Sequence, residues 1–383
     1  MHGIPVDVIY LDYSKAFVPH QRLIRQVSSF GIKDKALAWI ESFLTGRRQH
    51  VRVNDATSSW SPVDSGVPQG SVLGPTLFTL FVSDIPAAVE SVISMFADDT
   101  KLFTAISNTN SVETLGEDLR RLKDWSNLMQ MRFHPQKWKV IHLGTANPSS
   151  TNSMSTSYGT QHELESVTTE KDLGVIVDNE LQFSDHVRQI VNKANRVLGW
   201  LNHTFKFMTS ETMLLLYKSL VRPLLEYASC VWSPYLKSDK DLLENVQRLV
   251  TRMVPKLKKL SYSERLQSLK LPTLIFRRKR ADIIQTYKIL SGKETLNMDP
   301  RCSKCINKSM FQSTLSHKTR GHDLKLQKPE ATGVRHRFLA TRVVDDWNHL
   351  SSETVHAETI NQFKAGLARD WSDHPDLYEY RFS

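Results

Sequence analysis

The sequence predicts an α/β unit built on one sheet, followed by a longer region that is mostly α-helical. The first prediction rests on residues 6–143, where segments alternate as strand, helices, hairpin, helix and strand. This order is typical of a split βαβ sheet with helices on one face. The second rests on the region after residue 185, where apolar residues recur at helical spacing. With 40% hydrophobic and 23% charged residues among 383, the composition excludes a chain that is disordered as a whole.

The first strand is predicted over residues 6–11 (VDVIYL), a β-branched apolar run that ends at Asp12. Such a buried strand would present a carboxylate at its C-terminal end. Two helices are expected at residues 20–30 and 33–44, with Gly31 ending the first of them.

Two hairpins are predicted next. The first comprises residues 50–53 and 59–63, and the second spans residues 91–103 with Asp98 and Asp99 at its tip. Three glycines and two prolines make residues 65–75 too irregular for a helix or strand. The unit is completed by a helix at 114–131, a strand at 138–143 and a loop at 145–160.

Amphipathic helices dominate the remainder of the chain. One long helix is expected to begin after a Ser210 cap, and another to stop at Pro255. The predicted helices are 186–207, 211–232, 238–254, 337–350 and 359–371, with an irregular polar segment at 298–319.

The net charge of +10 is unevenly distributed. Residues 1–150 hold 15 basic and 14 acidic residues, which leaves 35 and 26 for the rest, and residues 246–290 alone hold twelve basic and two acidic ones. This density predicts a surface that binds a phosphate backbone, although a solvated helical face would have the same composition. The candidate nucleic-acid-binding residues are Arg248, Arg252, Lys256, Lys258, Lys259, Arg277, Arg278, Lys279 and Arg280.

The chain has three cysteines and no apolar run long enough to span a membrane. An odd number of cysteines in a chain of this length favours reduced thiols over a disulfide framework. We therefore expect an intracellular protein without a membrane partner.

Asp12, Asp98 and Asp99 are the carboxylates that the predicted elements would hold on rigid supports. Clustered carboxylates repel each other unless a cation lies between them. Hard oxygen ligands without His or Cys favour Mg²⁺ or Mn²⁺ over zinc, and such ions support in-line phosphoryl transfer. The alternative is that Asp98 and Asp99 simply favour a turn.

Several motifs in order resemble those of reverse transcriptases from non-LTR retrotransposons, of the LINE type and specifically jockey-like. The resemblance extends from about residue 6 to about residue 371. It is carried by residues 11–17 (LDYSKAF), 65–75 (SGVPQGSVLGP), 96–99 (FADD), 135–144 (PQKWKVIHLG), 172–175 (DLGV), 217–227 (YKSLVRPLLEY) and 319–348.

This resemblance implies a right-hand polymerase, with an α/β palm at residues 1–180, an all-α basic thumb at 181–295 and an α-rich C-terminal extension at 296–383. It implies that Asp12, Asp98 and Asp99 bind the catalytic metals and that Lys137 protonates the leaving pyrophosphate. Phe17 would be the steric gate against a 2′-hydroxyl group. The implied substrate-binding residues are Tyr13, Phe17, Pro68, Gln69 and Gly70.

The sequence also departs from the family pattern. Residues that normally separate Phe17 from the Val-Pro-His segment are missing, and Trp138 replaces a usual cysteine. Because the chain begins only eleven residues before Asp12, we expect most of the fingers and any endonuclease domain to be absent. The sequence then resembles the C-terminal part of a retroelement polymerase.

A zinc site is the remaining motif to consider. Cys302, Cys305, His317 and His322 approximate a zinc-finger spacing, but no ββα framework surrounds them, so an exposed polar loop is the other interpretation.

The resemblance implies RNA-directed DNA synthesis from an RNA template, a DNA primer and deoxynucleoside triphosphates, in the nucleus if the chain is active. The alternative is an inactive remnant that only binds nucleic acid.

Overall fold

The structure is a computed structural model of the chain. It describes residues 4–13, 18–107, 109–131, 133–134, 137–144, 146–155, 161–205, 209–295, 310–311, 321–330 and 333–380. The chain folds into two compact units, residues 2–170 and residues 171–383. Within the described residues, no helix combines the length and the apolar character needed to cross a membrane.

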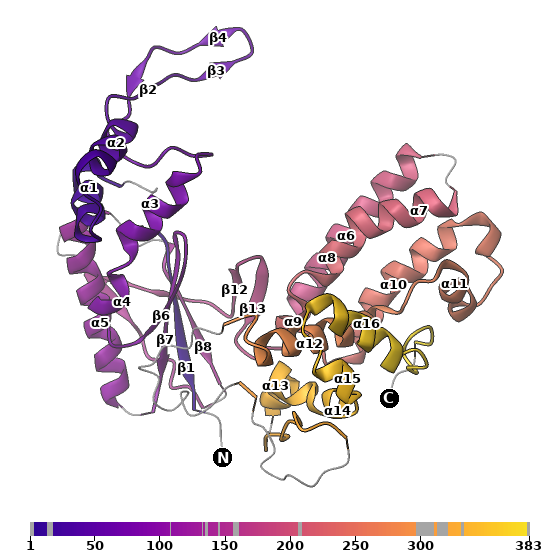
Figure 1. Cartoon of the computed structure of the whole chain (residues 1–383). Helices are drawn as coiled ribbons and strands as arrows, with labels where there is room; N and C mark the ends of the chain where they lie inside the picture. The colour runs from indigo at the N-terminus through magenta and orange to yellow at the C-terminus, as the bar shows by residue number, and fades with distance from the viewer. Residues whose placement is uncertain are drawn as a thin grey trace. The chain divides into compact units, whose positions relative to one another are not determined.

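In the first unit, α3, α4 and α5 lie on one face of the sheet, and α1 lies beside α2 and α3 (Figure 1). Its helices are α1 (His20–Ser29), α2 (Asp34–Leu44), α3 (Leu73–Val82), α4 (Ile85–Ala88) and α5 (Thr109–Met129). The strands of its main sheet are β1 (Val6–Leu11), β6 (Val92–Phe96), β7 (Asp99–Ala105), β8 (Lys139–Leu143) and β11 (Glu165–Ser166).

The sheet order is β11-β8-β1-β7-β6, so the N-terminal strand lies at the centre. β1 runs antiparallel to both β7 and β8, with Leu11 opposite Thr100 and Tyr10 opposite Lys139. β11 is parallel to β8. The predicted strands at 6–11, 91–103 and 138–143 are confirmed within one or two residues.

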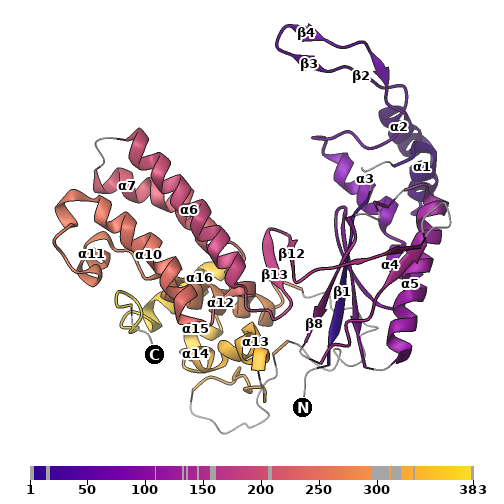
Figure 2. The ribbon, with the colours of Figure 1, turned by 180° about the vertical axis from the view of Figure 1, so that it is seen from behind.

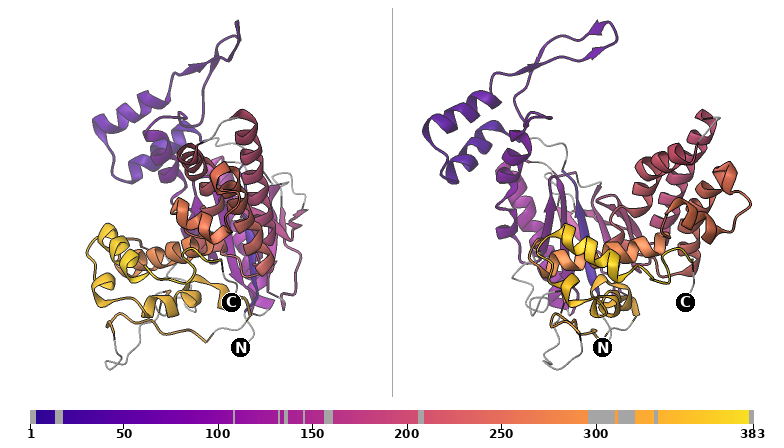
Figure 3. Two further views of the ribbon diagram at one scale, coloured as in Figure 1. Left: turned by 90° about the vertical axis from the view of Figure 1, so that its right-hand side faces the viewer. Right: turned by 45° about the vertical axis from the view of Figure 1, so that its right-hand side comes forward.

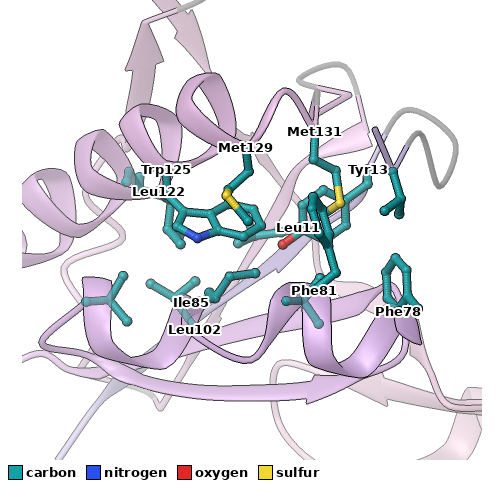
Figure 4. Packing of buried hydrophobic residues seen from close by; sticks show 14 of the residues in the cluster. Leu11, Tyr13, Phe78, Phe81, Ile85, Leu102, Leu122, Trp125, Met129 and Met131 are labelled. Carbon is teal, nitrogen blue, oxygen red and sulfur yellow. The ribbon is translucent and has the colours of Figure 1, made fainter. Parts of the chain in front are cut away.

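One core fixes the helices to this sheet. Figure 4 shows the side chains of Leu11 and Leu102, from adjacent strands, beside Phe81 and Trp125 from α3 and α5. Trp125 is anchored as well as buried, because its Nε1 donates to Oδ1 of Asp84 at 3.0 Å. The carboxylate of Asp118, fully buried on α5, accepts hydrogen bonds from the backbone N–H groups that precede β6, and so holds this strand against the helix.

Residues 47–63 form an arm that extends beyond α2 (Figures 2 and 3). It contains two short antiparallel pairs, β2 (Arg48–Gln49) with β5 (Ser61–Pro62) and β3 (Arg52–Val53) with β4 (Ala56–Thr57). Asn54 has φ 52°, so the predicted turn at this position is confirmed, although the strands pair differently from the prediction.

Residues 145–160 were expected to be a loop. Instead, β9 (Ser153–Ser155) pairs with β10 (Gln161–Glu163). These two strands form a small ladder separate from the main sheet.

The hairpin of β12 (Thr169–Asp172) and β13 (Val175–Asp178) spans the point in the sequence where the first unit ends and the second begins, and the described part of the second unit after it is helical. Its helices up to residue 290 are α6 (Ser184–Thr204), α7 (Ser210–Leu216), α8 (Arg222–Glu226), α9 (Ser229–Trp232), α10 (Lys237–Met253), α11 (Tyr262–Leu269) and α12 (Leu274–Leu290), with a π-helical turn at Tyr217–Val221. The short C-terminal helices are α13 (Leu339–Arg342), α14 (Val344–Asn348), α15 (Ser352–Val355) and α16 (Ile360–Asp370), preceded by a 3₁₀ turn at Gly333–Arg337.

The predicted single helix at 211–232 is wrong. The chain breaks at Ala228, whose φ is 52°, and the carbonyl of Tyr227 accepts a hydrogen bond from Trp232 Nε1 at 2.7 Å. The cap of the first piece is Thr209 rather than Ser210, since the Thr209 side chain accepts from the N–H of Thr212. The predicted helix at 337–350 is likewise divided, into α13 and α14.

Candidate active site

Asp12 follows the last residue of the central strand β1. Two residues more than 120 positions later in the sequence hold its backbone in place by hydrogen bonds. Its carbonyl oxygen accepts from the N–H of His134 at 3.0 Å and from Nε1 of Trp138 at 3.3 Å. Trp138, the residue that departs from the family pattern, is 1% exposed and packs edge-on against Phe133. The large ring is therefore accommodated, and it supports the backbone of Asp12.

Tyr13 lies in the core beside this carboxylate. Its ring stacks on Phe133 with centroids 4.6 Å apart, and burial raises the pKa of its hydroxyl group. Its side chain is only 4% exposed and belongs to the core, which does not favour the predicted contact of this side chain with substrate.

Lys137 reaches the Asp12 carboxylate. Its Nζ lies 2.8 Å from Oδ2 of Asp12, and the two side chains are 57% and 40% exposed. The ammonium group thus occupies a position on Asp12 at which a cation could bind.

The other two predicted catalytic carboxylates, Asp98 and Asp99, lie at the β6–β7 turn. Phe96 is opposite Asp99, and the turn between them consists of Ala97 and Asp98. Ala97 adopts φ 53°, a left-handed conformation that is unfavourable for a residue with a Cβ atom. Since Leu11 is opposite Thr100, continuing the antiparallel register puts Asp12 and Asp99 side by side at one end of the sheet.

A cavity of about 1480 Å³ in the first unit is lined by Asp98 and by the loop residues Pro68, Gln69 and Gly70. The loop has a defined shape: the side chain of Ser71 donates to the carbonyl of Pro68 at 2.7 Å. Gly70 has φ 78°, where glycine is favoured. The structure therefore brings the predicted substrate loop and one predicted catalytic carboxylate to the same cavity.

Sequence reasoning missed Arg47 and Arg48, which also line this cavity. Arg47 is held in place by hydrogen bonds to the carbonyls of Leu44 and Gly66, at 3.0 and 3.2 Å. The signal was the Gly-Arg-Arg sequence directly after the second helix, which places two cations at the base of the arm.

The three aspartates fit a divalent cation in donor type and in backbone placement. In the part of the chain that the structure describes, however, no three His, Cys, Asp or Glu side chains converge on a point where they could hold a metal together. The register of β1 and β7 places Asp12 and Asp99 next to each other, but the side chain of Asp12 is paired with Lys137.

Two predicted features involve residues without a described position. Phe17 lies outside the described residues, as do Cys302, Cys305 and His317 of the candidate zinc site. His322 is described: it is buried, and its Nε2 lies 3.2 Å from the carbonyl oxygen of Trp347. Burial also lowers the pKa of this imidazole.

The predicted nucleic-acid-binding residues fall into two groups. Arg252, Lys256, Lys258 and Lys259 are exposed around the end of α10. Arg248 is half-buried, with its guanidinium 4.8 Å from the ring centre of Tyr380.

Of the predicted residues on α12, Arg278 is buried, which corrects the prediction for this residue, while Arg277, Lys279 and Arg280 are half-buried. Arg278 is only 4% exposed, so it cannot reach a phosphate backbone. Arg277 forms a bidentate pair with Glu226, and Lys279 lies 2.7 Å from Asp376. Burial and nearby Arg277 lower the pKa of Arg280.

Comparison with known proteins agrees with this geometry. The sequence profile described as "Reverse transcriptase (RNA-dependent DNA polymerase)" matches residues 7–200, just over half of the chain. The chain is 30% identical to the RNA-directed DNA polymerase from mobile element jockey of Drosophila funebris, over 64% of this chain and 28% of that protein. It is 27% identical to a probable RNA-directed DNA polymerase from transposon BS of Drosophila melanogaster, over 65% of this chain and 29% of that protein.

Among solved structures, telomerase from Candida tropicalis in complex with the TWJ fragment of telomeric RNA aligns with a TM-score of 0.36 and 12% identity, covering 70% of this chain and 42% of that one. The chain spans less than a third of the length of the curated relatives named above. The profile match supports a right-hand polymerase fold for the region it covers. The chain belongs to the reverse transcriptase (RNA-dependent DNA polymerase) family.

Proposed function

We propose that this chain catalyses RNA-directed DNA synthesis, as part of the polymerase of a non-LTR retrotransposon. The observation that carries the proposal is the antiparallel register of β1 and β7, which supports Asp12 and Asp99 acting together next to Asp98. The relatives named as RNA-directed DNA polymerases favour this activity over nucleic-acid binding alone.

Asp12, Asp98 and Asp99 would hold Mg²⁺ or Mn²⁺, for which their oxygen ligands are suited. When bound, two such ions would activate the primer 3′-hydroxyl group and stabilise the charge on the leaving pyrophosphate. The protein contributes rigid supports: Asp12 by its doubly hydrogen-bonded carbonyl, and the aspartate pair by the tight β6–β7 turn.

Incoming deoxynucleoside triphosphate would bind in the cavity lined by Pro68, Gln69 and Gly70. Arg47 and Arg48 give this cavity positive charge suited to a triphosphate or to the template backbone. By resemblance, Phe17 would exclude a 2′-hydroxyl group.

Lys137 would act as the general acid for the pyrophosphate. Its ammonium is exposed and adjacent to Asp12, so that release from the carboxylate would free a proton donor next to the reacting phosphates.

The RNA template and DNA primer would form a duplex held by backbone charge rather than by base readout. The exposed cations of α10 and the following turn, Arg252, Lys256, Lys258 and Lys259, support this role for residues 181–295 as a thumb. In this proposal, residues 1–180 are the palm, residues 296–383 a C-terminal extension, and the nucleus the site of action.

The test is extension of a DNA primer on an RNA template by the purified chain with Mg²⁺. Asp98→Ala should abolish extension, whereas Asp124→Ala, which removes a similarly exposed acid from α5, should leave it unchanged. Duplex binding without extension in the unmodified chain would overturn the proposal and leave a protein that only binds nucleic acid.

A further inference from the structure

A second cavity, of about 200 Å³, lies inside the helical unit. Its walls come from α10, from α12 and from the C-terminal segment around α13, which are far apart in the sequence. Five of its lining residues are Lys or Arg and two are Asp. Two of the α12 cations that the sequence suggested for duplex binding, Arg278 and Lys279, line this cavity.

Arg342 and Lys279 are each paired with a carboxylate. Arg342 makes two hydrogen bonds to Asp282, at 2.8 and 2.9 Å, and its remaining N–H groups donate to the carbonyls of Cys230 and Arg337. Lys279 lies 2.7 Å from Asp376. The carboxylates therefore hold the side chains of Arg342 and Lys279 in fixed positions in the cavity wall.

Arg278 is different. It is 4% exposed, and its Nη1 has no hydrogen-bond partner among the described residues. An unsatisfied buried donor on a charged group is unfavourable, so the position calls for an acceptor. Burial lowers the pKa of the Lys240 ammonium group, and the nearby positive charges of Arg278 and Lys279 lower it further.

Arg337 supplies a further positive group at this cavity. Its guanidinium lies 4.5 Å from the ring centre of Tyr235, an arrangement that orients the cation without neutralising it. Asp346, the second acid, is half-buried, and burial raises the pKa of its carboxyl group.

We infer that this cavity binds a phosphate group, held by Arg278, Lys240 and Arg337. Guanidinium and ammonium donors suit a tetrahedral dianion, which would supply the missing acceptor for Arg278 after a small shift of the side chain. The volume is below that of sites for drug-sized molecules, about 300–1,000 Å³, and fits a small anion. The site does not depend on polymerase activity.

The phosphate has two candidate sources, a free small phosphate and the 5′-phosphate end of a nucleic acid. Isothermal titration of the full chain with inorganic phosphate, at ionic strength matched with sodium chloride, tests the shared chemistry. One saturable site is expected. Lys240→Met and Arg337→Gln should each weaken binding by about tenfold or more, since each removes a charged hydrogen-bond donor.

Lys218→Met, an exposed lysine of the helical unit outside the cavity, is the matched control and should bind phosphate within about twofold of the unmodified chain. Arg278→Met should abolish binding, and if this variant does not fold, Lys240→Met and Arg337→Gln still decide the question. Absence of saturable binding, equal binding of acetate, or undiminished binding by both of these variants would overturn the inference.

Competition then assigns the source. A short oligonucleotide with a 5′-phosphate that displaces inorganic phosphate, while its 5′-hydroxyl form does not, would identify a nucleic-acid end. If neither displaces it, the occupant is a free phosphate. Both results support the phosphate site.

Discussion

Replacing Lys137 with methionine should strengthen the binding of a divalent cation at Asp12 and at the same time slow DNA synthesis. The ammonium and the carboxylate are 2.8 Å apart, and their side chains are 57% and 40% exposed. Ion pairs this exposed contribute about 0.2–1 kcal/mol, so removing the competing ammonium should raise cation affinity by up to about fivefold.

Loss of the same group should lower the rate of extension by about a hundredfold or more, the contribution typical of a positioned general acid. The two effects have opposite signs, which distinguishes them from unfolding. Folding stability should change by less than about 1 kcal/mol, because the pair is exposed.

Electron paramagnetic resonance of Mn²⁺ measures cation binding without nucleotide, and single-turnover extension measures the rate. Lys139→Met is the matched control: it removes the same charge two residues away, where the lysine pairs with Glu170 at 2.7 Å. Unchanged or weaker Mn²⁺ binding in Lys137→Met, or equal strengthening in both variants, would refute the reasoning.

Three further predictions concern stability and binding. Asp118→Ala should lower the free energy of unfolding by about 2–4 kcal/mol, since it leaves the N–H groups of Glu90 and Ser91 unsatisfied; denaturant titration showing a decrease below about 0.5 kcal/mol would contradict this. Burial lowers the pKa of His186 from 6.5 to about 4, so the folded state binds fewer protons, and stability should be full above pH 6.5 and fall by about 2–3 kcal/mol as the pH drops toward 4. Unfolding curves at pH 7 and 4.5 check this, and His186→Gln should remove most of the dependence. The salt dependence of duplex affinity should become shallower, by about 0.9 in log–log slope for each exposed cation that is replaced and no longer neutralises a phosphate. A slope that is unchanged when all are replaced would argue against this surface; the residues to replace are Arg252, Lys256, Lys258 and Lys259.

The sheet and the main parts of the site follow from local sequence patterns. The apolar run before Asp12 and the acidic turn after Phe96 predicted both strand ends, and antiparallel pairing then brings them together. The loop before α3 was identified by its glycines and prolines, and Gly70 has positive φ, but residues 73–75 of the predicted irregular segment belong to α3.

The failures arise from interactions between distant residues. The break at Ala228 accompanies a hydrogen bond from the hydroxyl of Tyr227 to the carbonyl of Leu173, 54 residues away. Charge alone also could not show that Arg278 is enclosed, because its surroundings come from α10 and the C-terminal helices. Helical periodicity and composition do not record such partners.

The central claim is that Asp12, Asp98 and Asp99 act as one catalytic site. Single-turnover extension on an RNA template by Asp12→Asn, Asp98→Asn and the double variant tests it most directly. Each single change should lower the rate by about a thousandfold or more, and the double variant should be no slower than the worse single one, as expected for residues that work as a unit. Near-normal extension by Asp98→Asn, or losses that multiply in the double variant, would contradict a single shared site.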